Sequence, residues 1–295
     1  MQSKSKLTLD RNPRAGAIGA DEMPAMSPDP QQIVDALGRY RDISLEETND
    51  LAQMLKRIDN KYIVSRSMLL GVLDELRADF RILNIDGRSI FSYKSCYFDD
   101  DGQCFSEHQQ GKRQRFKVRT RLYVESGKAY FEVKLKGKRG QTDKRRKKCD
   151  SFFDFAVADE QHRMVQNLYE EHYEKDFLYD MTPALHVTYK RFTLVSASGG
   201  ERITVDFHLG FEAPSGKAAL IGDDFIIVET KSENGQGKSD QVLKRNRIRQ
   251  ATGCSKYCIG MALTDEVRRY NSFLPVVRKA RARLLRPIAP ALSDA

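Results

Sequence analysis

The sequence has no long apolar run, no secretory signal and no paired cysteine motif. Its 295 residues contain no stretch of roughly eighteen apolar residues, and residues 1–26 lack the apolar centre of a signal peptide. The sequence therefore predicts a soluble, cytoplasmic protein without a membrane span in this chain. The cysteines, 5 in number, form no zinc-type pair, and Cys254 and Cys258 have no histidine companions, which indicates unpaired, reduced thiols.

Glycine-rich phosphate loops and internal repeats are also missing. The charge balance is uneven, with 50 Lys and Arg against 41 Asp and Glu and a formal net charge of +9. Such a balance favours polyanionic partners, among them nucleic acid, phosphorylated metabolites and acidic membranes. The length fits one large or two modest domains.

The pattern along the chain predicts a disordered segment at residues 1–30, a main domain at 31–270 and a basic helical tail at 271–295. Helices are expected near residues 33–40, 45–57, 67–80, 158–177, 241–252 and 264–285, the last interrupted at Pro275. Strands are expected as an antiparallel meander over 89–153, and again at 184–196, 202–211 and 224–232.

Every second residue between Arg113 and Arg121 is basic. The residues of this row are Arg113, Arg115, Lys117, Arg119 and Arg121. Because successive side chains of a strand point to opposite faces, a strand here would place all of these cations on one face, about 7 Å apart. Like charges in such a row repel each other, so we expect an anion to lie along them.

The other predicted strands repeat this division into an apolar and a charged face. The charged faces carry, in chain order, Glu132, Lys134 and Lys136; Lys144, Arg146 and Lys148; Tyr189 and Arg191; Arg202, Thr204, Asp206 and His208; and Glu229 and Lys231. Two architectures fit. In one, the apolar faces form an ordinary core and the charges face water; in the other, the sheet closes with its charged faces inward and helices cover the outside. The second would form a basic tunnel, in which low dielectric strengthens the attraction for an anion.

Several segments resemble the catalytic domain of the vacuolar transporter chaperone (VTC) family, which belongs to the triphosphate tunnel metalloenzymes. These segments, in order, are RIDNKYIV at 57–64, YFDD at 97–100, GKRQRFKVRTRLY at 111–123, FEVKLK at 131–136, TYKRF at 188–192, RITVDFHL at 202–209, IIVETK at 226–231 and SKYCIGM at 255–261. The resemblance covers about residues 45 to 265. It implies an α+β fold in which an eight-stranded antiparallel β-tunnel with a charged lumen is flanked outside by helices, and which binds triphosphate or polyphosphate with a divalent metal.

The resemblance also implies roles for individual residues. Catalytic, phosphate-contacting positions would be Lys61, Arg119, Arg121, Lys134, Arg191, Arg202 and Lys256, the last positioning the growing chain near the tunnel mouth. Further substrate-binding positions would be Arg57, Lys117, Lys136, Lys144, Arg146, Tyr189 and Lys231. Glu229 matches a metal-binding carboxylate suited to Mn²⁺ or Mg²⁺. Glu132 is a second metal candidate, for which an ion pair with a neighbouring cation stays an equal alternative, and Asp206 is expected to orient an arginine.

Three functions are compatible with these residues. The resemblance implies a polyphosphate polymerase, a phosphotransferase that moves the γ-phosphate of ATP onto a growing polyphosphate chain. A tunnel triphosphatase acting on inorganic or nucleoside triphosphates would share the same site. A noncatalytic polyanion or nucleic-acid binding module is the third, but nucleic acid is disfavoured because its binding would not require Glu229 and Glu132 on the cationic faces.

The sequence departs from the eukaryotic pattern in having no N-terminal inositol-phosphate sensor domain and no membrane span. If synthesis is coupled to translocation, we therefore expect a separate membrane protein as partner, which would place the enzyme at the inner face of a membrane.

Overall fold

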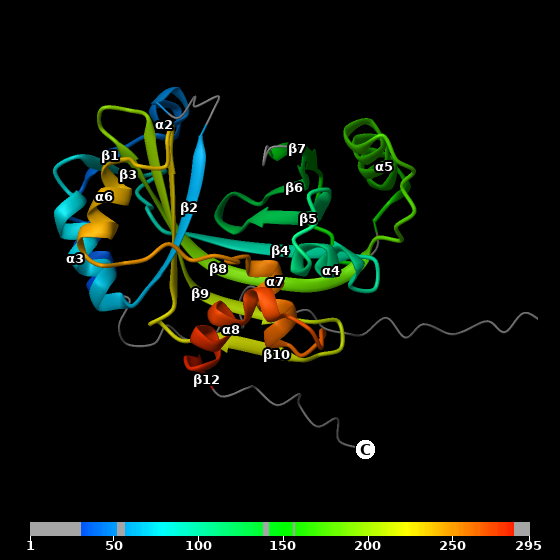
Figure 1. The fold of residues 1–295 in the computed structure, drawn as a ribbon. Helices are drawn as coiled ribbons and strands as arrows, with labels where there is room; N and C mark the ends of the chain where they lie inside the picture. Colours follow the sequence, from blue (N-terminus) through cyan, green and yellow to red (C-terminus); the bar gives the residue numbers. More distant parts are fainter. Residues whose placement is uncertain (1–30, 52–56, 138–141, 156, 286–295) are drawn as a thin grey trace, which may run out of the picture.

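The computed structural model describes residues 31–51, 57–137, 142–155 and 157–285. Its centre is a curved antiparallel sheet of eight strands (Figure 1). In spatial order these are β2 (Ile58–Val64), β11 (Ile226–Ser232), β9 (Glu201–Glu212), β8 (Thr182–Ser196), β4 (Phe91–Asp99), β5 (Arg115–Tyr123), β6 (Lys128–Lys136) and β7 (Thr142–Cys149). The predicted eight antiparallel strands and the α+β class are confirmed. The disordered segment predicted at 1–30, and residues 286–295 of the predicted tail, lie outside the described residues.

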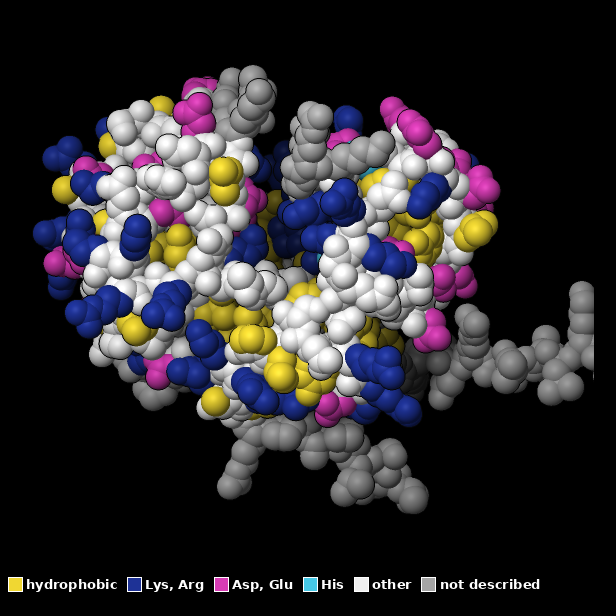
Figure 2. All heavy atoms as spheres, in the orientation of Figure 1, with side chains coloured by type: hydrophobic (Ala, Val, Ile, Leu, Met, Phe, Trp, Pro, Cys, Tyr) yellow, Lys and Arg dark blue, Asp and Glu magenta, His cyan; other side chains and the backbone are white. Residues whose placement is uncertain are grey.

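The sheet is a half-barrel and not a closed tube. Its edge strands β2 and β7 each pair with one neighbour, and among the described residues no ladder joins them to each other. Figure 2 shows a hollow between the two halves of the molecule, with Lys and Arg side chains in it. The charged concave face predicted from the sequence is therefore present, and within the described part of the chain no strand closes it between β2 and β7.

Short strands extend the two longest ones. β8 also pairs with β3 (Phe80–Leu83), which pairs with β1 (Arg41–Ile43), while the last residues of β9 pair with β10 (Ala218–Ile221), which pairs with β12 (Leu284–Leu285).

Helices cover the convex face, as predicted, through the apolar residues that alternate with the charged ones. α1 (Gln31–Leu37), α3 (Arg66–Leu76) and α6 (Lys238–Arg245) pack on the β2, β9 and β11 side, and α5 (Asp159–Tyr173) packs on β4 to β6, where Phe116, Val118 and Phe131 are fully buried. α2 (Leu45–Leu51) precedes β2. The remaining helices are α4 (Gln103–Gln109), α7 (Lys256–Leu263) and α8 (Leu274–Arg281), which share a third apolar cluster.

Helix α7 closes part of the concave side. Gly260 lies so close to β8 and β9 that a Cβ atom there would come within 2.4 Å of Leu185 and 2.5 Å of Phe211. This close approach places the N-terminus of α7, with Lys256, beside the charged residues of the concave face. Val276, Val277 and Ala280 of α8 then pack into the same cluster, so this part of the predicted C-terminal tail contributes to the core.

Several predicted elements have different bounds. The helix predicted at 67–80 ends at Leu76, because Phe80 and Ile82 join the sheet as β3. The helix predicted at 241–252 is α6, at Lys238–Arg245, and that predicted at 264–285 is wrong over its first half. Pro275 does not break a helix there; it occupies the first turn of α8, where its missing N–H costs nothing.

The predicted assignment of faces on β9 is also wrong from His208 onward. His208 has a φ of 52°, and the register between β8 and β9 shifts at this point, which makes a bulge. The bulge reverses the parity of β9, so Leu209 and Phe211 pack with α7 on the concave side, whereas Val205 and Phe207 pack on the convex side. Arg113 lies before the start of β5 and is exposed, so the cationic row on that strand has four members and not five.

Candidate active site

The wall formed by β5, β6 and β7 carries cations in cross-strand rows. Neighbours across the strands are Lys117, Lys134 and Lys144; then Arg119, Glu132 and Arg146; then Arg121, Tyr130 and Lys148. Cross-strand neighbours lie about 5 Å apart, so these side chains form a continuous charged surface. The alternation read from the sequence thus places one carboxylate, Glu132, among many cations.

Glu132 is held by two of these cations. It is 2% exposed, and its Oε2 accepts a 2.7 Å hydrogen bond from Arg119 Nε and a second contact from Arg119 Nη2, while Lys144 Nζ lies 2.7 Å from Oε1. Burial raises the pKa of Glu132, but Arg119, Arg121 and Lys144 outweigh it and hold the pKa well below its usual range. The ion-pair alternative for Glu132 is therefore what the structure shows, and a metal-binding role stays a prediction.

The opposite wall, formed by β2, β11 and β9, carries the second carboxylate. Glu229 Oε2 lies 3.0 Å from Lys61 Nζ and Oε1 contacts Lys231, which is also 2.9 Å from Asp59. Burial raises the pKa of Glu229, but Lys61 and Lys231 lower it far more. Desolvation and the charges of Lys61 and Lys117 lower the pKa of Lys134, on the β6 wall, to about 8, although the nearby Glu229 raises it. The charges of the two walls therefore influence one another.

Asp206 and two stacked tyrosines connect the walls. Asp206 is fully buried and accepts from Arg191 Nε at 2.5 Å and Nη2 at 2.8 Å, and it contacts Lys256 from α7. The prediction that Asp206 orients an arginine is confirmed. Burial raises the pKa of Asp206, but Arg191 and Lys256 lower it to about 2.

The tyrosines are Tyr93 and Tyr189, whose rings stack at 5.0 Å and 1°. The guanidinium carbon of Arg121 lies 5.5 Å and that of Arg191 5.3 Å from the Tyr93 ring centroid, and Lys256 Nζ lies 4.5 Å from that of Tyr189. These contacts restrict the orientation of the Arg121 and Arg191 guanidinium planes.

Some buried polar atoms on this face have no hydrogen-bond partner among the described residues. They are Tyr189 Oη, Arg202 Nε and Thr204 Oγ1. Buried polar atoms are normally paired, so these groups can form hydrogen bonds with a ligand on the concave face.

Most of the predicted site residues meet on the concave face. Arg57 lies at its edge, 37% exposed and 3.4 Å from Asp59, and Lys136 lies at the end of β6. The sequence reasoning missed the β4 and α7 residues that hold the cations. Tyr97 Oη accepts from Arg119 at 2.8 Å, Ser95 Oγ accepts from Arg121 at 3.3 Å, and Ser255 Oγ accepts from Lys117 at 2.7 Å. The alternation of Tyr93, Ser95 and Tyr97 could have revealed the first two.

Tyr97 carries the clearest electrostatic signature of the missed residues. Burial raises its pKa, but Arg119, Arg121 and Lys117 outweigh burial and lower the pKa to about 8. The net positive field on the concave face is therefore strong enough to lower the pKa of a buried phenol below its ordinary value.

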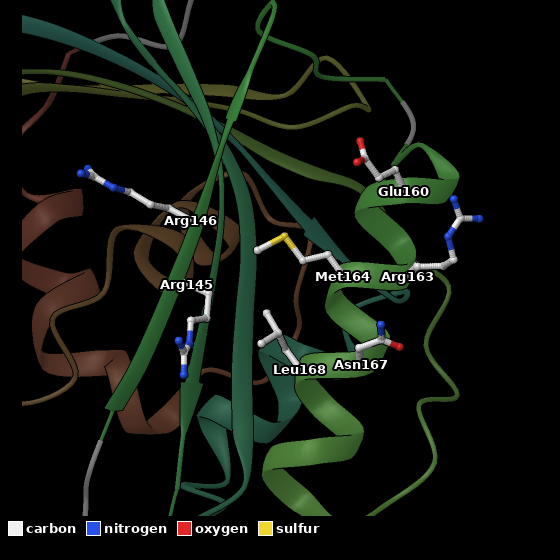
Figure 3. A pocket seen from close by; sticks show the side chains of 7 residues that line it. All are labelled: Arg145, Arg146, Glu160, Arg163, Met164, Asn167 and Leu168. Carbon is white, nitrogen blue, oxygen red and sulfur yellow. The ribbon is translucent and has the colours of Figure 1, made fainter.

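A surface pocket of about 550 Å³ lies elsewhere, between β7 and α5 (Figure 3). Met164 and Leu168 point from α5 toward the strand, whereas Arg146 points away from the helix. This pocket lies on the outer side of β7 and contains neither Glu132 nor Glu229. We therefore place the candidate active site on the concave face.

A comparison with protein families identifies the family of the chain. The model of the VTC domain matches residues 56–264, which include every strand of the half-barrel and both carboxylates. The chain therefore belongs to the VTC-domain family.

Solved structures with a related outline have low identity. The PH1819 protein from Pyrococcus horikoshii is 10% identical with a TM-score of 0.41, over 71% of this chain and 99% of that one. HpAC1 from Hippeastrum, described as having a dominant triphosphatase activity, is 13% identical with a TM-score of 0.39, over 70% of this chain and 95% of that one. Among curated proteins no match is found. Within the described residues, no helix has the length and apolar character needed to cross a membrane.

Proposed function

We propose that this VTC-domain protein is a metal-dependent phosphotransferase that moves the γ-phosphate of ATP onto a growing polyphosphate chain. The observation that supports it best is the extent of the cationic surface. The row from Arg115 to Arg121 spans about 20 Å along β5 and continues on β6 and β7, which is longer than a triphosphate requires. A polymer of phosphates would occupy such a surface along its length.

Phosphoryl transfer depends on positioning and charge stabilisation more than on covalent chemistry. Arg121 and Arg191 are held by the tyrosine stack and by Asp206, so their guanidinium groups can bind nonbridging oxygens with little further ordering. Lys61 and Lys134 would add compact charge from opposite walls, and Lys256 would position the chain.

In this proposal a terminal oxygen of the acceptor polyphosphate attacks the γ-phosphorus in line. A new P–O bond forms, the bond between the γ-phosphorus and the β,γ-bridging oxygen breaks, and the electron pair leaves with ADP. No covalent phosphoenzyme is required.

A divalent metal would fit this site only together with its substrate. Among the described residues no group of three His, Cys, Asp or Glu side chains converges as a ligand set. Mg²⁺ commonly binds through one or two carboxylates plus phosphate oxygens, and Glu229 is an ionised carboxylate of this kind once substrate draws Lys61 or Lys231 away. The metal, Mn²⁺ or Mg²⁺, would neutralise charge developing on the transferred phosphate.

The test is incubation of the purified protein with ATP and Mn²⁺, followed by gel electrophoresis for a long anionic polymer and by measurement of ADP. Polymer and ADP together would support the proposal. Free phosphate without polymer would show a triphosphatase instead, and RNA binding that survives Arg119→Ala and Arg191→Ala would show a noncatalytic polyanion binder.

A matched pair of variants locates the activity. Arg121→Ala removes a cation of the concave face and should abolish polymer formation. Arg145→Ala removes a cation of the same sheet that lies at the outer pocket, where its side chain is 60% exposed and pairs with Asp143. This variant should leave activity unchanged. Equal losses in both variants would contradict the placement of the site.

A further inference from the structure

Aromatic side chains gather at one end of the cationic row. Tyr123 follows Arg121 on the concave side of β5, Tyr93 pairs with it from β4, and Tyr130 of β6 lies opposite Arg121. The ring centroids of Tyr93 and Tyr123 are 5.1 Å apart, and those of Tyr123 and Tyr130 are 5.7 Å apart. The concave positions at the other end of β5 and β6 are not aromatic; they are Arg115, Lys117, Lys134 and Lys136.

Tyr130 differs from the other tyrosines of the site in the accessibility of its ring. Tyr189 is 1% exposed and stacked on Tyr93, and Tyr97 is stacked on Tyr257, so these rings are occupied within the protein. Tyr130 is half-buried and lies at 80° to Tyr123, so among the described residues no aromatic ring stacks parallel on it.

The contact on that ring is an exposed cation. The guanidinium carbon of Arg146 lies 5.0 Å from the Tyr130 centroid. Arg146 is exposed, points away from α5 (Figure 3), and among the described residues makes no hydrogen bond or ion pair. An aromatic ring beside an exposed guanidinium is a typical platform for a nucleobase, because both groups stack on flat π systems.

We propose that Tyr130 and Arg146 form the stacking subsite for the base of the nucleoside triphosphate substrate. The inference rests on the proposed function and adds the place and orientation of the nucleotide. Because Tyr130 and Arg121 are direct cross-strand neighbours, about 5 Å apart, a base on Tyr130 places its phosphates at Arg121, with the γ-phosphate deeper along the row. The acceptor chain then lies toward Arg115 and Lys136.

Stacking of this kind recognises any base, so the subsite should distinguish a nucleotide from a bare triphosphate but not ATP from GTP. The experiment is isothermal titration calorimetry without divalent metal, so that no turnover occurs. The ligands are ATP, GTP, ribose 5′-triphosphate, which lacks only the base, and tripolyphosphate.

For the wild type we expect ATP and GTP to bind about equally and about 5- to 100-fold more tightly than ribose 5′-triphosphate. Tyr130→Ala should remove this difference and leave the Kd of tripolyphosphate unchanged, whereas Tyr130→Phe, which keeps the ring, should preserve it. Arg145→Ala, on the other face of β7, is the control and should change none of these ratios.

Equal binding of ATP and ribose 5′-triphosphate to the wild type would overturn the subsite, and this comparison needs no variant to fold. A Tyr130→Ala protein that loses tripolyphosphate as strongly as ATP would also overturn it, since Tyr130 would then only support Arg121. Failure of the wild type to bind tripolyphosphate would instead refute the phosphate site itself, and with it the proposed function.

Discussion

Replacing Glu132 by Gln tests whether the concave face stores electrostatic repulsion that a phosphate ligand relieves. The variant keeps the size of the side chain but leaves Arg119, whose side chain is 20% exposed, without its buried counter-charge. Breaking a buried ion pair typically costs about 3–5 kcal/mol; we expect about 3 kcal/mol here, because Lys144 is 44% exposed and can turn to water. At about 2–4 °C per kcal/mol for a protein of this size, Tm should fall by roughly 6–12 °C.

The same substitution should improve phosphate binding. With the carboxylate gone, the Arg119 fork is free to bind oxyanions, so tripolyphosphate should bind the variant more tightly than the wild type. Tripolyphosphate at a hundredfold excess over its Kd contributes about 2.7 kcal/mol and should therefore restore most of the lost Tm. Differential scanning fluorimetry with and without tripolyphosphate measures both effects.

The pH dependence and a control variant complete this test. The folded-state pKa of Glu132 is lowered, so the stability it contributes is present above the ordinary glutamate pKa and is lost as pH falls toward the folded value. The gap in Tm between wild type and variant should narrow accordingly in acid. Glu160→Gln removes an exposed carboxylate that pairs with Lys147 and should leave Tm nearly unchanged. An unaltered Tm for Glu132→Gln, or weaker tripolyphosphate binding, would refute the reasoning.

Three further predictions follow from the site and the packing. Glu229→Gln should abolish metal-dependent turnover while tripolyphosphate affinity, measured calorimetrically without metal, is at least that of the wild type, because Lys61 and Lys231 keep their charges; unchanged turnover would exclude Glu229 as the metal ligand. The pKa of Lys134 is lowered to about 8 in the folded state, so between pH 8 and the ordinary lysine pKa the unfolded chain binds more protons than the folded protein. In this pH range the stability of the wild type should rise with pH relative to that of Lys134→Met. Tripolyphosphate affinity should fall over the same range as Lys134 loses its proton. Parallel pH profiles of stability for the two proteins would contradict this. Gly260→Ala should destabilise the fold by about 1–3 kcal/mol in urea unfolding, because its Cβ would overlap Leu185 and Phe211, and a stable variant would show that α7 can move away from the sheet.

The sequence determined the strands and most of their faces. Alternation is a local property with a period of two, so the cations of β5 and the apolar Phe116 and Val118 between them could be assigned without knowing any partner strand. The carboxylates Glu132 and Glu229 could be placed on the charged faces for the same reason. The family resemblance then predicted that these faces share one concave surface, and the observed strand order agrees.

Only the tertiary structure decided where the pattern is interrupted and which residues hold the cations in place. The bulge at His208 depends on the pairing of β8 with β9, and it reverses the parity of Leu209 and Phe211, which no local rule reveals. Helix α7 is buried on all sides, so its sequence lacks the amphipathic period that predicts a helix. Its contact with the sheet could therefore not be predicted from the sequence. The ion pair of Glu132 with Arg119 depends on the register of β5 with β6, and that of Asp206 with Lys256 on the position of α7 against the sheet, and both are set only in the folded half-barrel.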